Sequence, residues 1–476
     1  MFGFDRQQQA ILHLTWMAFF LTFVAWFNLA PFNTTLMATQ GLTENQVRAL
    51  MICNVALTIP ARIVIGSLVD ACGPRRVFVW ILLFAAGVSA LFATARTFPE
   101  FLVSRLLMGV VGAGFVVGIK MIAEWFPPGK MGTAQGIYAG WGNFGAAAAV
   151  FALPLVAELF PRELGWRVAA GLSGLLCLVW AGVYHRFARE IPERAAAFPV
   201  SLEHFIEVTS RRDLVLQILL LVPIYTALGL LVVKLAAPPV ALLAPEVFWV
   251  FLFLLSGLFA WNAVTCIRYN QDRIASPVPP DKQYAFKQIA ILSLVYALTF
   301  GSELAVVSMF PEFLETTFNL TVTSAGMLGS GFALFNLVTR PSGGWLSDRL
   351  GRRRVLFGLV AGAGLCYWFM GEIDPGWPVS RALGLAVLCS VFIQAGNGAC
   401  FAMVPLVRRD LTGQLAGLAG AYGNVGAVIF LTVLSFVDAI VFFKFIAGYA
   451  GFVILCLLFL DSFQDTHASF QSNRRD

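Results

Sequence analysis

Four basic side chains lie inside long apolar stretches of the chain, where lipid rather than water would surround them. They are Arg62, Arg105, Lys120 and Arg340. A charge at bilayer depth costs from about 3 kcal/mol on insertion scales to more than ~10 kcal/mol in simulations, so each of these residues requires a partner or a function. Their positions divide them into two pairs with different predicted roles.

Arg62 and Arg340 occupy matching positions in the two halves of the chain. Each precedes an aspartate, Asp70 or Asp348, by eight residues, which is about 12 Å along a helix. Both arginines are therefore predicted near the middle of the membrane, where transporters built from repeats hold their substrates. The alternative is that each arginine is buried against a carboxylate, but the first six apolar stretches offer few acids at that depth.

Two guanidinium groups without matched acids predict an anionic substrate. A guanidinium is planar and presents paired N–H donors, so two of them facing each other favour a small planar oxyanion over a carbohydrate or a cation. Arg105 and Lys120 are predicted to be structural instead. Arg105 lies near the outer end of its stretch, where it can reach the surface or a helix end, and Lys120 can pair with Glu124 one turn further on.

The composition shows what kind of element must hold these side chains. Hydrophobic residues make up 59% of the 476 residues and charged residues only 12%, against roughly a quarter charged in soluble domains. So few charges cannot cover a water-exposed surface, and no run of like charges indicates a nucleic-acid partner. We therefore expect an all-α integral membrane protein solvated by membrane lipid, because continuous apolar runs satisfy their backbone in lipid as helices.

Fourteen stretches are long enough to cross a bilayer, which takes about 20 residues per helix. An even number places both termini on one side, and the concentration of Lys and Arg in the loops of that side predicts that it is cytoplasmic. We expect two six-helix halves, 1–190 and 287–476, with an extra lipid-facing hairpin in 191–286. The predicted spans are roughly 11–32, 47–69, 77–95, 100–123, 132–156, 165–186, 213–233, 241–267, 287–311, 322–346, 354–372, 380–405, 412–437 and 440–461.

A turn with the pattern G-x-L-x-D-x-x-G-x-R starts at residue 66 and again at residue 344, 278 residues later. Its glycines permit a tight turn and close helix contact, while its charged residues can cap helix ends and form a switchable latch. The turn resembles the signature loop of the major facilitator superfamily. This resemblance implies a cytoplasmic gate made of Asp70, Arg75, Asp348 and Arg352.

A second repeated motif places an asparagine between glycines. It reads Gly142-Asn143-Phe144-Gly145 in stretch 132–156 and Gly423-Asn424-Val425-Gly426 in stretch 412–437. Such glycines let neighbouring backbones approach and leave one polar amide for the central cavity. Together with the two arginines, these motifs resemble the paired nitrate signatures of the nitrate/nitrite porter family within the major facilitator superfamily. The extra hairpin is the main departure from the twelve helices usual in that family.

The resemblance implies a secondary transporter of nitrate, nitrite or both in the cytoplasmic (inner) membrane, not an enzyme, working as a monomer without a cofactor. It implies that Phe115 and Phe401 cover the two faces of a flat anion and that Tyr296 supplies a hydroxyl donor. The substrate-binding residues that it implies are Arg62, Arg340, Asn143, Asn424, Phe115, Phe401 and Tyr296, with Gly142, Gly145, Gly423 and Gly426 for helix packing.

Glu303 is the candidate for coupling transport to protons. It lies seven residues beyond Tyr296 on the same helix face, which predicts a position about 10 Å outside the arginine layer. The hypothesis is that Glu303 is ionised when the site is empty and protonated when an anion is bound, giving nitrate/H+ symport. A pure nitrate/nitrite exchanger needs no titratable group, and Glu303 would then have only a hydrogen-bonding role.

Other functions remain as alternatives. Formate or a short carboxylate is a second substrate class for two facing arginines, and an anion channel or a membrane sensor are alternatives outside the transporter class. The eight cysteines and four histidines show no metal-ligand, disulfide or catalytic spacing. The sequence therefore predicts no metal, no cofactor and no catalytic residue.

Overall fold

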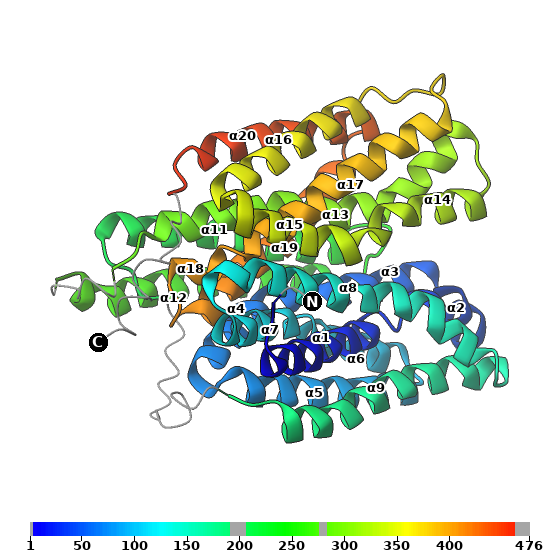
Figure 1. Ribbon diagram of the computed structural model, residues 1–476. Helices are drawn as coiled ribbons and strands as arrows, with labels where there is room; N and C mark the ends of the chain where they lie inside the picture. Colours follow the sequence, from blue (N-terminus) through cyan, green and yellow to red (C-terminus); the bar gives the residue numbers. More distant parts are fainter. Residues whose placement is uncertain (1–2, 191–205, 276–282, 462–476) are drawn as a thin grey trace.

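The computed structural model describes residues 3–190, 206–275 and 283–461, and these residues fold into helices with no strand among them (Figure 1). Capping boxes at Asp5, Thr43 and Thr97 satisfy the free N–H groups at three helix starts. Gly73 and Gly351 separate consecutive helices with φ of +88° and +94°. Only glycine adopts such a backbone without strain, and the two positions are again 278 residues apart.

The helices form two bundles, drawn in blue to green and in green to red in Figure 1. The first contains α1 (Arg6–Trp26), η1 (Ala30–Phe32), α2 (Asn33–Gln40), α3 (Glu44–Ala56), α4 (Thr58–Cys72), α5 (Pro74–Thr94), α6 (Phe98–Val111), α7 (Gly114–Trp125), α8 (Pro128–Ala157) and α9 (Arg162–Phe187). The second contains α13 (Phe286–Phe318), α14 (Val322–Leu334), α15 (Asn336–Leu350), α16 (Arg352–Met370), α17 (Val379–Phe401), α18 (Val404–Val407), α19 (Thr412–Leu434) and α20 (Ala439–Leu457).

Between the bundles comes the predicted hairpin, α11 (Arg211–Ala236) and α12 (Pro245–Ala275). Both helices are long and apolar enough to span a membrane, yet only 6% of the most apolar segment of α12 is buried. α11 packs against α19 and α13, and α12 packs mainly against α11. The role of this hairpin as a scaffold or a lipid-facing pair stays a prediction.

Among the described residues, 12 helices are long and apolar enough to cross a membrane. The two predicted spans missing from this set are 322–346 and 354–372. The first is divided between α14, with 13 residues, and α15, with 15, and the second corresponds to α16, which starts with three arginines. Fourteen spans and cytoplasmic termini therefore stay predictions.

The two bundles meet through two symmetric helix pairs. α4 of the first bundle packs against α19 of the second, and α8 of the first packs against α15 of the second. At each crossing two glycines touch, Gly66 with Gly413 and Gly132 with Gly344, and a Cβ on any of them would overlap the partner's backbone. The glycines of the repeated turn thus permit close contact between the halves.

Candidate functional site

Both predicted arginines follow an interruption of the helix that carries them. α3 gives way to α4 at Leu57, and α14 gives way to α15 at Phe335, again 278 residues apart. Pro60 contributes to the first break because a proline ring clashes with the carbonyl four residues before it. Arg62 and Arg340 are each the fifth residue of the second segment. Such half-helix N-termini carry positive potential, which favours an anion.

Arg62 is 1% exposed and makes its hydrogen bonds to backbone carbonyls. Its Nη1 donates to the carbonyl of Gly420 on α19 at 2.5 Å, and its Nε donates to the carbonyl of Gly112 at 3.4 Å. Because Gly420 belongs to the second bundle, Arg62 reaches across the boundary between the halves. None of the described carboxylates forms an ion pair with it.

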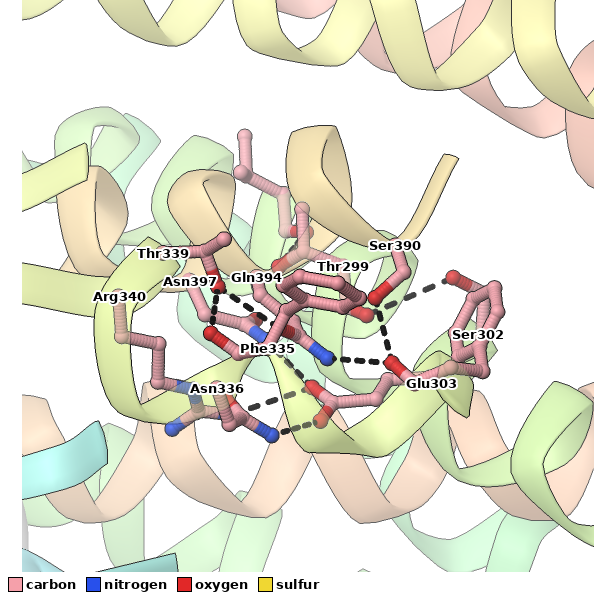
Figure 2. Close-up of polar contacts among 12 residues, drawn as sticks. Thr299, Ser302, Glu303, Phe335, Asn336, Thr339, Arg340, Ser390, Gln394 and Asn397 are labelled. Carbon is pink, nitrogen blue, oxygen red and sulfur yellow. Dashed lines mark hydrogen bonds and ion pairs between the residues drawn. The ribbon is translucent and has the colours of Figure 1, made fainter. Parts of the chain in front are cut away.

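Arg340 is equally buried but has an acid partner (Figure 2). Its Nη2 lies 3.2 Å from Oε2 of Glu303, which is 5% exposed. Asn336 donates to Oε1 of the same carboxylate at 2.6 Å, and Asn397 donates to Oε2 at 2.7 Å. Glu303 is thus held by one guanidinium and two amides in a buried polar cluster.

This pair corrects two expectations from the sequence. Glu303 contacts Arg340 directly instead of lying about 10 Å outside the arginine layer, and Arg340 is therefore not free of an acid. The prediction counted only helical rise, whereas the long side chains of Glu303 and Arg340 extend toward each other and close the gap. The expectation that Arg340 lacks an acid rested on the few acids of the first six spans, whereas its partner Glu303 lies on α13 in the second half.

An aromatic cluster adjoins both arginines. The rings of Phe115 and Phe401 contact each other edge to face with centroids 4.7 Å apart, and the ring of Tyr296 is nearly parallel to that of Phe115 at 6.2 Å. The structure brings these three predicted residues together, although Phe115 and Phe401 are not parallel plates. Their role in covering a flat anion stays a prediction.

Phe300 is the aromatic residue that the sequence interpretation passed over. The guanidinium carbons of Arg62 and Arg340 both lie 5.5 Å from its ring centroid, within the range of a cation–π interaction. Phe300 therefore lies within cation–π distance of both arginines. Its spacing of four residues from Tyr296, one helical turn, was the signal that could have found it.

The glycine–asparagine motifs lie at close helix contacts within each half. A Cβ at Gly142 or Gly145 would overlap α1, and one at Gly423 or Gly426 would overlap α13. The Nδ2 donors of Asn143 and Asn424 are buried without a hydrogen-bond partner. Neither amide bonds to Arg62 or Arg340, so both have a donor to offer to another acceptor.

The repeated turns bind the start of a helix in the opposite half. Asp70 accepts from the backbone N–H groups of residues 413 and 414 at 2.9 and 2.8 Å, and Asp348 accepts from those of residues 132 and 133 at 3.2 and 2.9 Å. Arg352 pairs with Asp348 at 3.1 Å and also donates to the carbonyl of Pro128. These contacts close this end of the bundle.

Two basic residues near the gate make contacts that the sequence interpretation did not include. Arg75 donates to the carbonyl of His185, so this contact stays inside the first half. Lys120, expected to pair with Glu124, lies 2.8 Å from Asp70 and donates to the carbonyls of Arg409 and Asp410 in the second half. Lys120 is therefore part of the contact between the halves. No group of three His, Cys, Asp or Glu residues that could hold a metal occurs in the described part of the chain.

Comparison with known proteins defines the class of protein. The chain matches the sequence model of the Major Facilitator Superfamily over residues 15–277 and 292–472. Its fold resembles that of FucP in the outward conformation, with a TM-score of 0.63 at 13% identity, covering 96% of this chain and 100% of that one. It also resembles the human organic anion transporter MFSD10, with a TM-score of 0.61 at 17% identity, covering 95% and 100%. The chain is a membrane transporter of this superfamily.

Curated relatives narrow the class. The chain is 41% identical to the nitrate/nitrite transporter NrtP of Picosynechococcus sp., covering 89% of this chain and 84% of the relative. It is 40% identical to NrtP of Nostoc punctiforme, covering 97% and 93%, and 26% identical to high-affinity nitrate transporter 2.3 of Oryza sativa, covering 90% and 72%. The chain belongs to the nitrate/nitrite porter family, whose members are multi-pass transporters of the membrane and not enzymes.

Proposed function

We propose that this protein carries nitrate, and also nitrite, across the cytoplasmic membrane by alternating access, and that it takes up a proton with each anion. The observation that carries the proposal is the pair of buried guanidinium groups from opposite halves beside Phe300, of which only Arg340 holds an acid. The names of the relatives support nitrate and nitrite as substrates.

The charges of the site support proton coupling through Glu303. With Glu303 ionised, two arginines and one carboxylate leave a net charge of one positive unit. When a nitrate enters and a proton neutralises Glu303, two arginines and the nitrate again leave one positive unit. The anion takes the place of the carboxylate as the partner of Arg340, and a proton removes the repulsion between the two negative groups.

The same balance explains how the empty protein returns. Loaded and empty carriers have equal charge in the site, so the charge moved in one reorientation is cancelled by the return step, and the complete cycle carries no net charge across the membrane. Exchange of nitrate for nitrite uses only the loaded form, with Glu303 protonated throughout.

The contacts between the halves support alternating access. The closed end carries the turns that start at residues 66 and 344, which the charge distribution assigns to the cytoplasm. Opening this end requires Asp70 and Asp348 to leave the helix starts that they bind, while the halves 1–190 and 287–476 rock about the arginines. An anion bound by both guanidinium groups favours the closed approach of the halves because it removes their mutual repulsion.

Purified protein in liposomes tests the substrate. We expect uptake of labelled nitrate that saturates, that unlabelled nitrite inhibits, and that trapped nitrite accelerates. Formate and acetate at equal concentration should inhibit less than nitrite does. Stronger inhibition by formate than by nitrite would make another small anion the substrate, and conductance that does not saturate would indicate a channel.

A further inference from the structure

Arg105 on α6 is a buried arginine that belongs neither to the gate nor to the central site. It was expected to reach the surface or a helix end, but its side chain is 0% exposed. Its Nη1 donates to Oδ1 of Asn28 at 2.9 Å, and Nδ2 of Asn28 donates to Oγ of Ser173 at 2.9 Å. Arg105 therefore links α6 to the segment after α1 and to α9 inside the first bundle.

One edge of the Arg105 guanidinium has no hydrogen-bond acceptor. Its Nε and Nη2 are both buried and unpartnered. These two nitrogens point their N–H bonds in parallel along the same edge, the fork that binds a planar oxyanion through two hydrogen bonds. The ring of Phe92 lies 3.7 Å from the guanidinium carbon and covers one face, which leaves this edge as the one that a ligand could contact.

The charge of Arg105 is also uncompensated. No carboxylate in the described ranges forms an ion pair with it, whereas Arg340 and Arg352 each have one. A buried charge is stable in protein or lipid when it is paired and hydrogen-bonded. The cation–π contact with Phe92 and the bond to Asn28 leave two charged N–H donors unsatisfied.

Two further unpartnered polar atoms occur in this part of the first bundle. Trp166, whose ring centroid lies 5.5 Å from that of Phe92, has a buried Nε1 without a partner. Ser89, one turn before Phe92 on α5, has a buried Oγ without a partner. Both groups are hydrogen-bond donors, and both side chains are 0% exposed. Around Arg105 the first bundle thus collects donors and positive charge without an acid.

We propose that the free edge of Arg105 is a second binding site, for a small monovalent anion of the nitrate and halide class. It is distinct from the central site, because Arg105 stands seven residues, about 10 Å along α6, before Gly112, whose carbonyl binds Arg62. An anion held there neutralises Arg105 and joins the helices that surround it, so it stabilises the first bundle and is not itself carried.

A bromide soak tests the site directly in the wild-type protein. Crystals of the full-length protein soaked in sodium bromide should show an anomalous peak within hydrogen-bonding distance of both Nε and Nη2 of Arg105. Density for water at this edge, with bromide bound elsewhere in the same crystal, would overturn the proposal. This outcome does not depend on whether the protein transports nitrate.

Thermal unfolding separates the site from the central one. In an Arg62→Met background, which disables central binding, replacing gluconate with nitrate or bromide should still raise the Tm, and adding Arg105→Met should abolish the rise. The matched control is Arg48→Met, which removes an exposed arginine and should leave the rise unchanged. A rise that persists without Arg105, or no rise in the Arg62→Met protein, would contradict the proposal.

Discussion

Arg62 and Arg340 are equivalent in the repeat and differ in their partners. Arg62 bonds to backbone carbonyls, one of them in the opposite half, and has no acid among the described residues. Arg340 pairs with Glu303 inside its own half. The backbone repeat thus supplies two matching cations, of which Arg340 has a carboxylate partner. In the proposed mechanism this carboxylate makes the second half sensitive to protons, while the first half stays a fixed positive group.

This difference assigns separate tasks to the two arginines. An anion meets Arg62 as a donor group without a competing carboxylate, but it must replace Glu303 at Arg340. If the proposed mechanism holds, binding at the first arginine sets how strongly the anion is attracted, and binding at the second decides whether a proton accompanies it. Changes on the two sides should have different consequences.

The largest expected effect comes from removing the planar fork at each arginine. Arg62→Lys and Arg340→Lys keep the charge but lose one charge-assisted hydrogen bond to the anion, about 2 kcal/mol or roughly 30-fold in affinity. Both variants should lose nitrate uptake, with the weaker binding in Arg62→Lys because lysine at 340 also holds Glu303 less firmly. Binding is measured by calorimetry and uptake in liposomes. Robust uptake by either variant would refute the proposal that each guanidinium group binds the anion through paired hydrogen bonds.

Glu303→Gln should remove the difference between the two arginines. Without a carboxylate to displace, nitrate should bind about tenfold more tightly, the equivalent of one charge-assisted bond of about 1.4 kcal/mol. Calorimetric titrations at a fixed pH measure this. Glu312→Gln, an exposed position on the same helix, is the control, and equal behaviour of the two variants would show that Glu303 does not compete.

The gate should respond equally on both sides, because its glycines are matched. Gly413→Ala and Gly344→Ala place a methyl group against the opposing backbone, which costs about 1–3 kcal/mol of stability in the closed state. We expect slower uptake and a lower Tm in both variants. Gly448→Ala, where a Cβ meets nothing within 4 Å, is the control. A large effect in only one of the two would show that the halves do not close symmetrically.

Phe300→Leu should have the smallest effect. It removes a cation–π contact of about 0.5–1 kcal/mol from each arginine but keeps the apolar volume, so nitrate affinity should fall by about fivefold or less. Initial uptake rates over a range of nitrate concentrations measure this as a higher KM. A loss as large as that of the lysine variants would mean that the ring itself contacts the substrate.

Much of the fold could be predicted from the sequence because lipid leaves few solutions. Long apolar runs must be helices, and the repeat of the turn starting at residues 66 and 344 fixed the symmetry of the halves. The interruptions at Leu57 and Phe335 were not predicted, since hydropathy does not register a break of one residue. For the same reason the sequence could not show that α14 and α15 are separate helices.

The sequence predicted the main residues of the site, but it did not predict all of their contacts. Arg62 and Arg340 could be identified because a charge is rare inside an apolar stretch and because the two residues occupy matching positions in the two halves. The pair between Arg340 and Glu303 was missed because it depends on side-chain reach and helix packing, which residue counting along one helix does not include. Asn336 and Asn397 have no charge to mark them, and only their place beside the carboxylate gives them a role.

Accumulation of nitrate against its gradient tests the central claim most directly. Liposomes containing the wild-type protein or Glu303→Gln are given either an imposed pH gradient, alkaline inside, or trapped nitrite without a gradient. The account predicts that the wild type accumulates nitrate in both cases, and that Glu303→Gln exchanges nitrate for nitrite but does not respond to the pH gradient. Equal pH-driven accumulation by both proteins would contradict it.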